Sequence, residues 1–360
     1  MELRELTLRE YRPKSMLQVP EHPIEKPRFP VIDIHNHSEW RGRWLVADVP
    51  ALVDAMDEAG VAARVDLDGG NGERLRKHMD TFRSRWPERF AIFASCEWDK
   101  HLDYDDFGER MARELRQSVA EGAEGLKVWK ELGLTLRDDK GHLIAIDDER
   151  LTPLFQTAGE CGIPVLIHSA DPMAFFEPLN HENERYEELI DHPDWHFHGS
   201  EFPSFAELQR QLASLLARHP NITFIGAHVA SLAENLSLVG QMFSRFPHLQ
   251  VDIAARISEL GRQPYTTADF LTRYSDRVLF GRDNCPAVAD EYRVYYRFLE
   301  TRDEYFPYWS NPNEEVGDSG RWMIYGVGLS DEVLKNIYHG NAVRILPRLN
   351  QAVSAMSRVL

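Results

Sequence analysis

Short apolar runs alternate along this chain with longer stretches in which apolar residues recur every three or four positions. The runs have the length of buried β-strands, and the longer stretches have the period of helices that pack one face on a core. Eight such runs are found, at residues 31–37, 61–67, 90–95, 125–129, 163–168, 222–228, 249–254 and 278–283. Where no long loop intervenes, their starts lie about 30 residues apart, which matches a repeating βα unit.

The stretches between the runs carry helix signals. Residues 49–59 have Leu52, Val53 and Met56 at helical spacing, and Gly60 stands where a glycine commonly ends a helix. The alternation predicts an α/β protein with one (β/α)8 TIM barrel over residues 31–360. A doubly wound sheet rarely places eight units in this regular order. Residues 1–30 are expected to form an extended N-terminal arm laid over the fold, and two helices are expected at the C-terminus.

One long segment, residues 169–204, interrupts this rhythm after the fifth strand. It is rich in proline, histidine and acidic residues. A loop of this length in a compact domain usually serves as a lid or as a partner surface, and the sequence leaves both roles open. Its aromatic residues, among them Phe175, Phe176 and Trp195, are expected to pack locally, with the lining of a substrate pocket as the alternative.

Charge and cysteine content narrow the choice of partners. The chain has 41 Lys and Arg against 58 Asp and Glu, a formal net charge of −17, which argues against nucleic acid and anionic membranes as partners. Residues 1–30 lack the apolar core of a signal peptide or a membrane span. The three distant cysteines, Cys96, Cys161 and Cys285, favour a reducing, cytoplasmic location. We expect a small-molecule substrate as the partner and leave homo-oligomer formation open.

Ionisable residues gather where the predicted strands end, and in barrels of this class the chemistry takes place at the carboxyl ends of the strands. Alternation in the first strand places Asp33, His35 and His37 on one side, where two imidazoles can grip one cation. The whole set is His35, His37, Asp66, Asp68, Glu97, Lys127, His168, His228, Arg256 and Asp283. Three or four imidazoles with a carboxylate suit zinc or a similar divalent ion.

The motifs that carry these residues stand in a fixed order. They are Ile32-Asp-Ile-His-Asn-His37, Val165-Leu-Ile-His168, Ile225-Gly-Ala-His228, Leu279-Phe-Gly-Arg-Asp283, and the segment from Asn336 to Leu346. As a set they resemble the amidohydrolase superfamily, and within it the small amidohydrolases related to aminocarboxymuconate-semialdehyde decarboxylase. Around the eighth strand, Arg282 and Cys285 depart from the pattern of relatives, which concerns the substrate side more than the metal.

The resemblance implies roles for individual residues. It implies a metal held by His35, His37, His168 and Asp283, with Asp283 also able to accept a proton. It implies that His228 lies beside the activated water as acid or base, which agrees with the ability of an imidazole to take up a proton near neutral pH.

The resemblance also bears on the number of metals and on the substrate. In two-metal relatives, a lysine at the position of Lys127 is carboxylated and bridges the ions, but one metal is usual in the branch that this chain resembles. We therefore expect one divalent ion, zinc with manganese as the alternative, and a second ion bridged by Lys127 is the less favoured reading. Lys127 would then hold a substrate anion or form a salt bridge to Asp66 or Glu97. Arg256 stands where relatives bind a substrate carboxylate, which a guanidinium can grip with two hydrogen bonds.

These expectations favour an enzyme. The first candidate is a metal-dependent hydrolase acting on an amide or lactone carbonyl of a small polar or anionic substrate. The alternative is a non-oxidative decarboxylase, a lyase acting on a small aromatic or unsaturated carboxylic acid. A barrel that only binds a metal or a ligand is disfavoured, because binding alone does not require a base such as His228.

Overall fold

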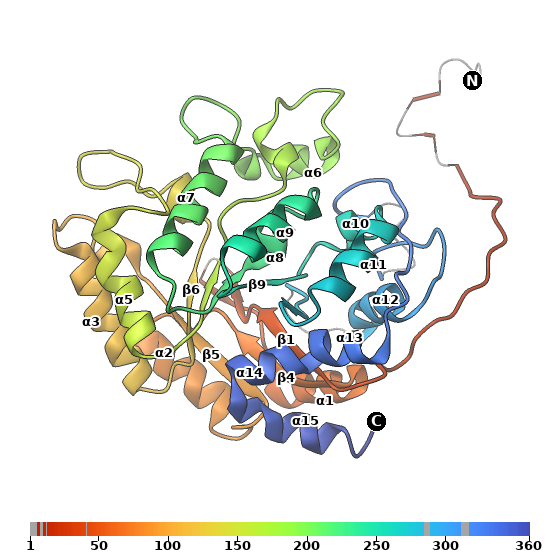
Figure 1. The fold of residues 1–360 in the computed structure, drawn as a ribbon, viewed down its shortest axis with the longest axis horizontal. Coiled ribbons are helices and arrows are strands. Elements are labelled where there is room, and N and C mark those ends of the chain that lie inside the picture. The colour runs from red at the N-terminus through yellow and green to blue at the C-terminus, as the bar shows by residue number, and fades with distance from the viewer. Residues whose placement is uncertain (1–5, 8–9, 12, 41, 284–288, 311–316) are drawn as a thin grey trace.

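The computed structural model describes residues 6–7, 10–11, 13–40, 42–283, 289–310 and 317–360. In this part of the chain, eight parallel strands form one sheet in sequence order, and each pairs with the next (Figure 1). They are β1 (Val31–Asn36), β4 (Val61–Asp66), β5 (Phe90–Ser95), β6 (Gly125–Val128), β7 (Val165–Ile167), β8 (Phe224–Gly226), β9 (Leu249–Asp252) and β10 (Val278–Leu279). Strands β2 (Glu39–Trp40) and β3 (Arg43–Trp44) form a separate hairpin.

The two edges of the large sheet meet. Ile34 N donates a hydrogen bond to Phe280 O at 3.0 Å, and Asp283 N donates one to His35 O at 2.8 Å. These bonds join the first strand to the segment that follows the last. The predicted (β/α)8 barrel is therefore confirmed.

Helices follow the strands and surround the barrel (Figure 1). Those between strands are α1 (Val49–Ala59), α2 (Gly72–His78), α3 (Phe107–Ala120), α4 (Glu131–Leu134), α5 (Thr152–Glu160), α6 (Tyr186–Asp191), α7 (Phe205–Arg218), α8 (Ala227–Ala230), α9 (Leu236–Arg245), α10 (Ile257–Leu260) and α11 (Pro264–Arg273). After β10 come α12 (Ala289–Glu300), α13 (Asp331–Lys335), α14 (Asn341–Ile345) and α15 (Asn350–Met356). Helix α1 has the predicted bounds, because Asp48 caps its start and Gly60, with φ 71°, ends it.

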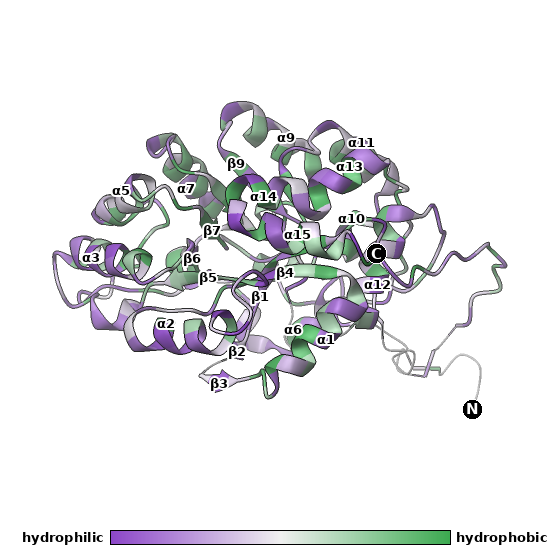
Figure 2. Cartoon of the chain, turned by 90° about the horizontal axis from the view of Figure 1, so that it is seen from below, coloured by the Kyte–Doolittle hydropathy of each residue, from purple (hydrophilic) through white to green (hydrophobic). Residues whose placement is uncertain are grey.

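Two apolar layers hold the barrel together. Alternate strand residues form one buried cluster with the C-terminal helices; it includes Ile32, Ile34, Ala63, Val65, Phe93, Leu166, Ile225, Leu279, Val353 and Met356. The other strand face packs on the surrounding helices, as where Phe107, Met111 and Leu115 of α3 are buried at every fourth position. Figure 2 shows hydrophilic residues interspersed with hydrophobic ones along these outer helices. The expected C-terminal helices thus complete the core that the strands begin.

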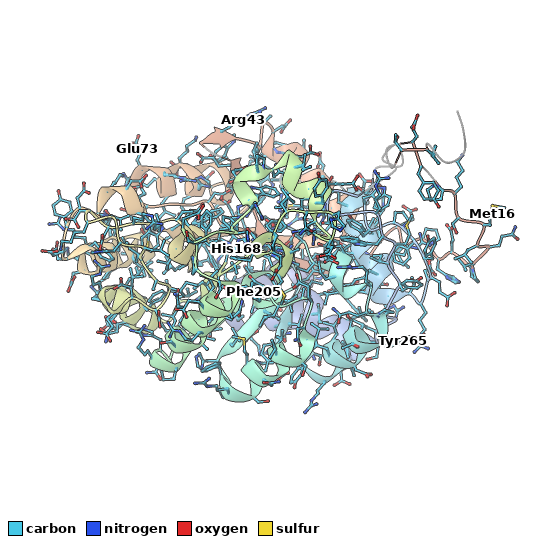
Figure 3. The ribbon with its side chains drawn as sticks, turned by 90° about the horizontal axis from the view of Figure 1, so that it is seen from above. Met16, Arg43, Glu73, His168, Phe205 and Tyr265 are labelled. Carbon is cyan, nitrogen blue, oxygen red and sulfur yellow. The ribbon has the colours of Figure 1, made fainter. Side chains whose placement is uncertain are left out.

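The N-terminal arm lies against the body only along its last part. His22 donates two hydrogen bonds to Asp303, from N at 2.7 Å and from Nδ1 at 2.6 Å. Nearer the N-terminus the chain runs away from the barrel, and Met16 and Leu17 are exposed (Figures 1 and 3). None of the described helices is both long and apolar enough to cross a membrane.

Close packing of α3 yields a test of this architecture. A Cβ atom added at Gly108 would lie 1.8 Å from the carbonyl oxygen of Arg150, in the turn that precedes α5. We predict that Gly108→Ala lowers the free energy of unfolding by about 2 kcal/mol, because the helix must move away from that turn. Chemical denaturation measures this loss. The exposed neighbour Glu109→Ala is the control and should change stability by less than about 0.5 kcal/mol; equal stability of the two variants would contradict the packing.

Candidate functional site

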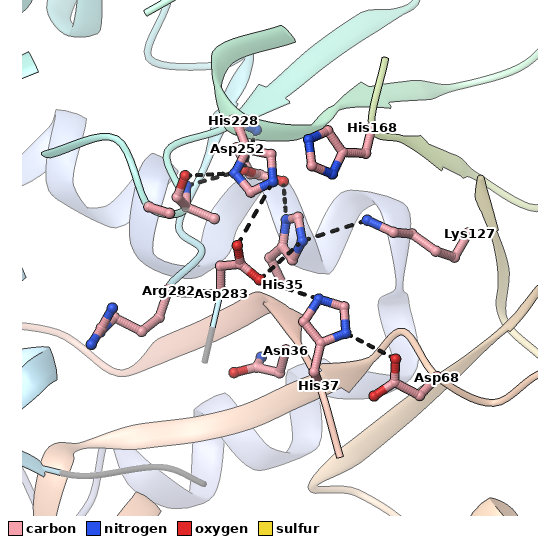
Figure 4. Close-up of polar contacts among 12 residues, drawn as sticks. His35, Asn36, His37, Asp68, Lys127, His168, His228, Asp252, Arg282 and Asp283 are labelled. Carbon is pink, nitrogen blue, oxygen red and sulfur yellow. Dashed lines mark hydrogen bonds and ion pairs between the residues drawn. The ribbon is translucent and has the colours of Figure 1, made fainter. Parts of the chain in front are cut away.

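Four of the side chains singled out in the sequence meet at the carboxyl ends of the strands (Figure 4). His35 Nε2 lies 3.6 Å and His37 Nε2 3.2 Å from Asp283 Oδ1, while His228 Nε2 lies 3.8 Å from Asp283 Oδ2. His35, His37 and Asp283 therefore offer three ligand atoms within 4.8 Å of one another. We call these three residues with His228 the histidine–aspartate cluster.

The three imidazoles of the cluster are oriented by their other ring nitrogen. His35 Nδ1 donates to Asp252 at 2.9 Å, and His37 Nδ1 donates to Asp68 at 2.9 Å. His228 Nδ1 donates to the Ala254 carbonyl at 2.8 Å. In a neutral ring, a proton held on Nδ1 leaves a free lone pair on Nε2. The Nε2 atom of each of these rings faces Asp283. This is the arrangement by which proteins set a histidine to bind a metal.

The charges of the cluster suit a cation. Burial by itself would raise the pKa of Asp283, but His35, His37 and His228 hold it well below its usual value, so this carboxyl is ionised. Burial, followed by the charge of Lys127, holds the pKa of His35 well below its usual value, so this imidazole is neutral. Burial acts against it, but Asp68 and Asp283 raise the pKa of His37 to about 9, so this ring would give up a proton on binding a metal. Imidazoles without that proton beside an ionised carboxylate are the donor set that divalent zinc takes. The residues present therefore fit a divalent metal.

Lys127 reaches the cluster from β6. Its side chain is fully buried, and Nζ lies 3.5 Å from His35 Nε2. Burial lowers the pKa of Lys127 to about 8, although Asp283 and Asp252 act in the opposite direction. Among the described residues no ion pair joins Lys127 to Asp66 or Glu97. Asp66 lies 2.5 Å from His78, and Glu97 pairs with Lys100. The structure therefore does not contain the alternative considered for Lys127, a salt bridge to Asp66 or Glu97.

His168 lies beside the cluster without touching Asp283. Its ring packs edge-on against His228 with centroids 4.4 Å apart. Its Nε2 is buried, lies 3.3 Å from Asp171 Oδ1, and makes no aligned hydrogen bond. Neither group of metal-ligand atoms that the described residues form includes His168. The ring of His168 packs on the cluster, but its Nε2 lies next to Asp171. We keep His168 as a proposed fourth ligand.

A β-bulge in β1 corrects one expectation from strand alternation. The register between β1 and β4 shifts between Asp33 and Asn36. The carboxylate of Asp33 accepts a hydrogen bond from Tyr292 of helix α12 at 2.6 Å, whereas His35 points into the cluster. The prediction that Asp33 shares a side with His35 and His37 is wrong, because the bulge re-aims the residues that follow it.

His228 is placed by a turn of unusual backbone conformation. Four successive non-glycine residues after β8, from His228 to Ser231, have φ between 55° and 60°. Left-handed backbone costs about 1–2 kcal/mol per residue. Buried Ser231 holds the end of the turn, since its hydroxyl bonds to the backbone N and O of Ala170. Strain of this kind is retained where the surroundings enforce it, most often at functional sites.

Arg256 lies just past β9 and its charge acts on His228. Burial, His168 and Arg256 together hold the pKa of His228 well below its usual value. Arg256 is 8% exposed and donates from its side chain to the Ala255 carbonyl at 2.6 Å. Within the described part of the chain it forms no ion pair with a carboxylate. A buried guanidinium with unused donors is suited to an anion.

Buried charges fasten the segment 169–204 to the rest of the fold. Arg185 is almost fully buried and pairs with Glu188 at 2.7 Å and with Glu259 of helix α10. At the surface, Arg262 pairs with Glu184 at 2.9 Å. The segment is therefore attached to α10 and to Arg262, which follows that helix. The guanidinium of Arg262 is engaged with Glu184.

The aromatic residues of the same segment pack mainly on each other. Phe175 and Phe176 are buried, and the Phe176 ring lies 5.7 Å from that of Phe197. Trp195 stacks on His192 with centroids 4.1 Å apart. The expectation of local packing is confirmed for these side chains.

The structure adds residues that the sequence reading did not assign. Asp252 orients His35, Asp68 orients His37, and Asp171 lies against His168. Asp252 is the last residue of β9 and lies inside the predicted run 249–254, whose pattern does not mark it as a strand end. Cys285, noted above as a departure from the pattern, lies outside the described residues.

Comparison with known proteins identifies the family. The sequence profile of the family described as Amidohydrolase matches residues 32–348. This chain belongs to the amidohydrolase family. No curated protein matches the sequence significantly.

Solved structures share the barrel at low sequence identity. An uncharacterised TIM-barrel protein from Bordetella bronchiseptica has a TM-score of 0.51 at 15% identity, covering 89% of this chain and 100% of its own. 2,6-Dihydroxybenzoate decarboxylase from Rhizobium has a TM-score of 0.53 at 14% identity, with coverage of 89% and 99%. A dihydroxybenzoic acid decarboxylase from Polaromonas sp. JS666, with bound manganese and the inhibitor 2-nitroresorcinol, has a TM-score of 0.54 at 16% identity, with coverage of 89% and 97%. At these low sequence identities, the likeness to the solved structures shows a shared fold alone.

Proposed function

We propose that this amidohydrolase is a metal-dependent hydrolase acting on an amide or lactone carbonyl of a small polar or anionic substrate. The observation that carries the proposal is the hydrogen bond from His228 Nδ1 to Ala254 O at 2.8 Å. It leaves His228 Nε2 without a proton, 3.8 Å from Asp283. An imidazole held in this tautomer can take a proton from water. Hydrolysis needs such a base at the site.

Each residue has a definite part in the reaction. A divalent cation held by His35, His37, His168 and Asp283 would polarise the carbonyl and make water a better acid. As the water oxygen bonds to the carbonyl carbon, His228 Nε2 takes the water proton. The bond from that carbon to nitrogen or oxygen then breaks, and His228 gives the proton to the leaving group. Because His228 is charged between these steps, the nearby carboxylate of Asp283 stabilises it.

The substrate is proposed to be anionic in spite of the acidic chain. Arg256 and Lys127 are both buried cations beside the cluster. A substrate carboxylate would pair with the unused donors of Arg256 and recover the energy lost in burying a charge. Lys127 would hold a second polar group near His35.

The second candidate is the non-oxidative decarboxylation of a small aromatic or unsaturated acid. The same two buried cations favour it, because the carboxylate that leaves must first be held. Two of the similar structures are named as dihydroxybenzoate decarboxylases, but their identities of 14% and 16% speak for the fold alone.

We predict about one equivalent of a divalent metal per chain, because His35, His37 and Asp283 offer three donor atoms within reach of one ion. Zinc is the expected ion, with manganese as the alternative. Elemental analysis of protein purified without chelators measures the content. His35→Ala and His168→Ala should each lose most of the metal. Two equivalents that fall to one in Lys127→Ala would contradict the single-metal assignment, and no metal in wild-type protein would refute the mechanism.

We predict that Arg256→Met raises KM about tenfold to a hundredfold with little change in kcat, because the lost contact is present in ground and transition states alike. Steady-state kinetics on a substrate found in a screen of amides, lactones and aromatic acids gives both constants. Arg262→Met is the matched control, since its guanidinium is engaged by Glu184. An unchanged KM in Arg256→Met would make this arginine structural.

We predict that reaction in oxygen-18 water places one heavy oxygen in the new carboxylate, because hydrolysis consumes water. Mass spectrometry of the product detects the label. Decarboxylation would instead release carbon dioxide and, in heavy water, leave deuterium on the vacated carbon. That result would replace the hydrolase assignment with a lyase and leave the proposed metal ligands unchanged.

A further inference from the structure

We propose that Asp252 is the positioning residue that fixes both a metal ligand and the base, His35 and His228, through the two oxygens of one carboxylate. The proposal rests on the metal site of the proposed function and adds to it the residue that prepares that site. Asp252 ends β9 on the inner face of the barrel and is completely buried.

The two carboxylate oxygens of Asp252 accept hydrogen bonds from different groups. Oδ2 accepts a hydrogen bond from His35 Nδ1 at 2.9 Å. Oδ1 accepts from the backbone N of His228 at 2.9 Å and from Ala254 N at 3.0 Å. The first contact sets which nitrogen of His35 carries the proton. The contact with His228 N holds the start of the left-handed turn that brings His228 to the cluster. The contact with Ala254 N holds the residue whose carbonyl accepts from His228 Nδ1.

Both contacts bear on the same geometry. His228 Nδ1 donates to the carbonyl of Ala254, whose own N–H is bonded to Asp252. The rings of His35 and His228 lie 4.7 Å apart. Asp252 thus ties the ligand on β1 to the base after β8 without contributing a group to the reaction.

Asp252 could instead be read as a metal ligand, because its oxygens lie within 4.8 Å of nitrogens of His35 and His228. The hydrogen bonds argue for positioning. Both oxygens already accept from N–H groups, and the His35 atom that faces Asp252 is Nδ1, whereas Nε2 faces Asp283. A cation at Asp252 would have to displace these donors.

The substitution Asp252→Asn separates the contact with His35 Nδ1 from the contacts with the backbone N atoms of His228 and Ala254. The amide oxygen of Asn can still accept from His228 N and Ala254 N, so the backbone turn keeps its support. The amide nitrogen then faces His35 Nδ1 as a donor and makes that nitrogen an acceptor. The proton of His35 moves to Nε2, the atom that should bind the metal. Orienting partners of metal-bound histidines are worth about 10- to 100-fold in metal affinity.

Two measurements on the full chain test the proposal. The first is a long-range proton–nitrogen spectrum of metal-free, 15N-histidine-labelled protein, with the His35 signals assigned by their loss in His35→Gln. We expect the His35 proton on Nδ1 in the wild type and on Nε2 in Asp252→Asn. The second is calorimetric titration with Zn2+, in which Asp252→Asn should bind about 10- to 100-fold more weakly. Asp303→Asn is the control, because this buried aspartate accepts from His22 away from the cluster.

The outcomes are distinct. A His35 proton on Nε2 in the wild type overturns the proposal even if Asp252→Asn does not fold. Unchanged His35 signals and unchanged zinc affinity in a folded Asp252→Asn also overturn it. If Asp252→Ala binds zinc more weakly than Asp252→Asn while His35 keeps its proton on Nδ1, Asp252 is a ligand and the positioning role is refuted. Failure of the wild type to bind zinc refutes the proposed function, while the spectrum still decides the role of Asp252.

Discussion

The closure of the barrel between its first and last strands is the constraint on which the site depends. The hydrogen bond from Asp283 N to His35 O, 2.8 Å long, joins two residues at opposite ends of the barrel sequence. It brings the carboxylate of Asp283 within 3.6 Å of two imidazoles. Without closure these groups would lie at opposite edges of an open sheet. The parallel order of all eight strands then turns every carboxyl end toward the same mouth.

Within that mouth, buried polar groups are arranged so that each imidazole has one occupied nitrogen and one available nitrogen. The carboxylates of Asp252 and Asp68 and the carbonyl of Ala254 accept hydrogen bonds from the Nδ1–H groups. The cost of burying these groups is offset by hydrogen bonds that leave the Nε2 atoms facing Asp283. The left-handed turn at His228 adds local strain, and its surroundings hold it in place. These hydrogen bonds would hold the proposed metal ligands in position before a metal binds.

The surroundings of the mouth bear on the proposal that an acidic protein receives an anionic substrate. The charge of −17 belongs to the whole chain, whereas the groups beside the cluster include the buried cations Lys127 and Arg256. Local charge acts at short range in a medium of low dielectric constant, and the distant surface charge is screened by salt. The segment 169–204 bounds this region and is fastened by Arg185 to Glu259, so its position is fixed by a buried ion pair.

The sequence by itself determined the barrel, because the apolar period of each segment is a local property that needs no knowledge of its neighbours. It also placed His35, His37, His228 and Asp283 at strand ends, since a motif directly after an apolar run must lie there. Tertiary structure alone decided what crosses between elements: the bulge that parts Asp33 from His35, the placing of His168 against Asp171, and the double role of Asp252. Those features depend on strand register and on contacts between distant residues, such as His35 and Asp252, which are 217 positions apart. The residue pattern of one strand does not show which residues of another strand will lie against it.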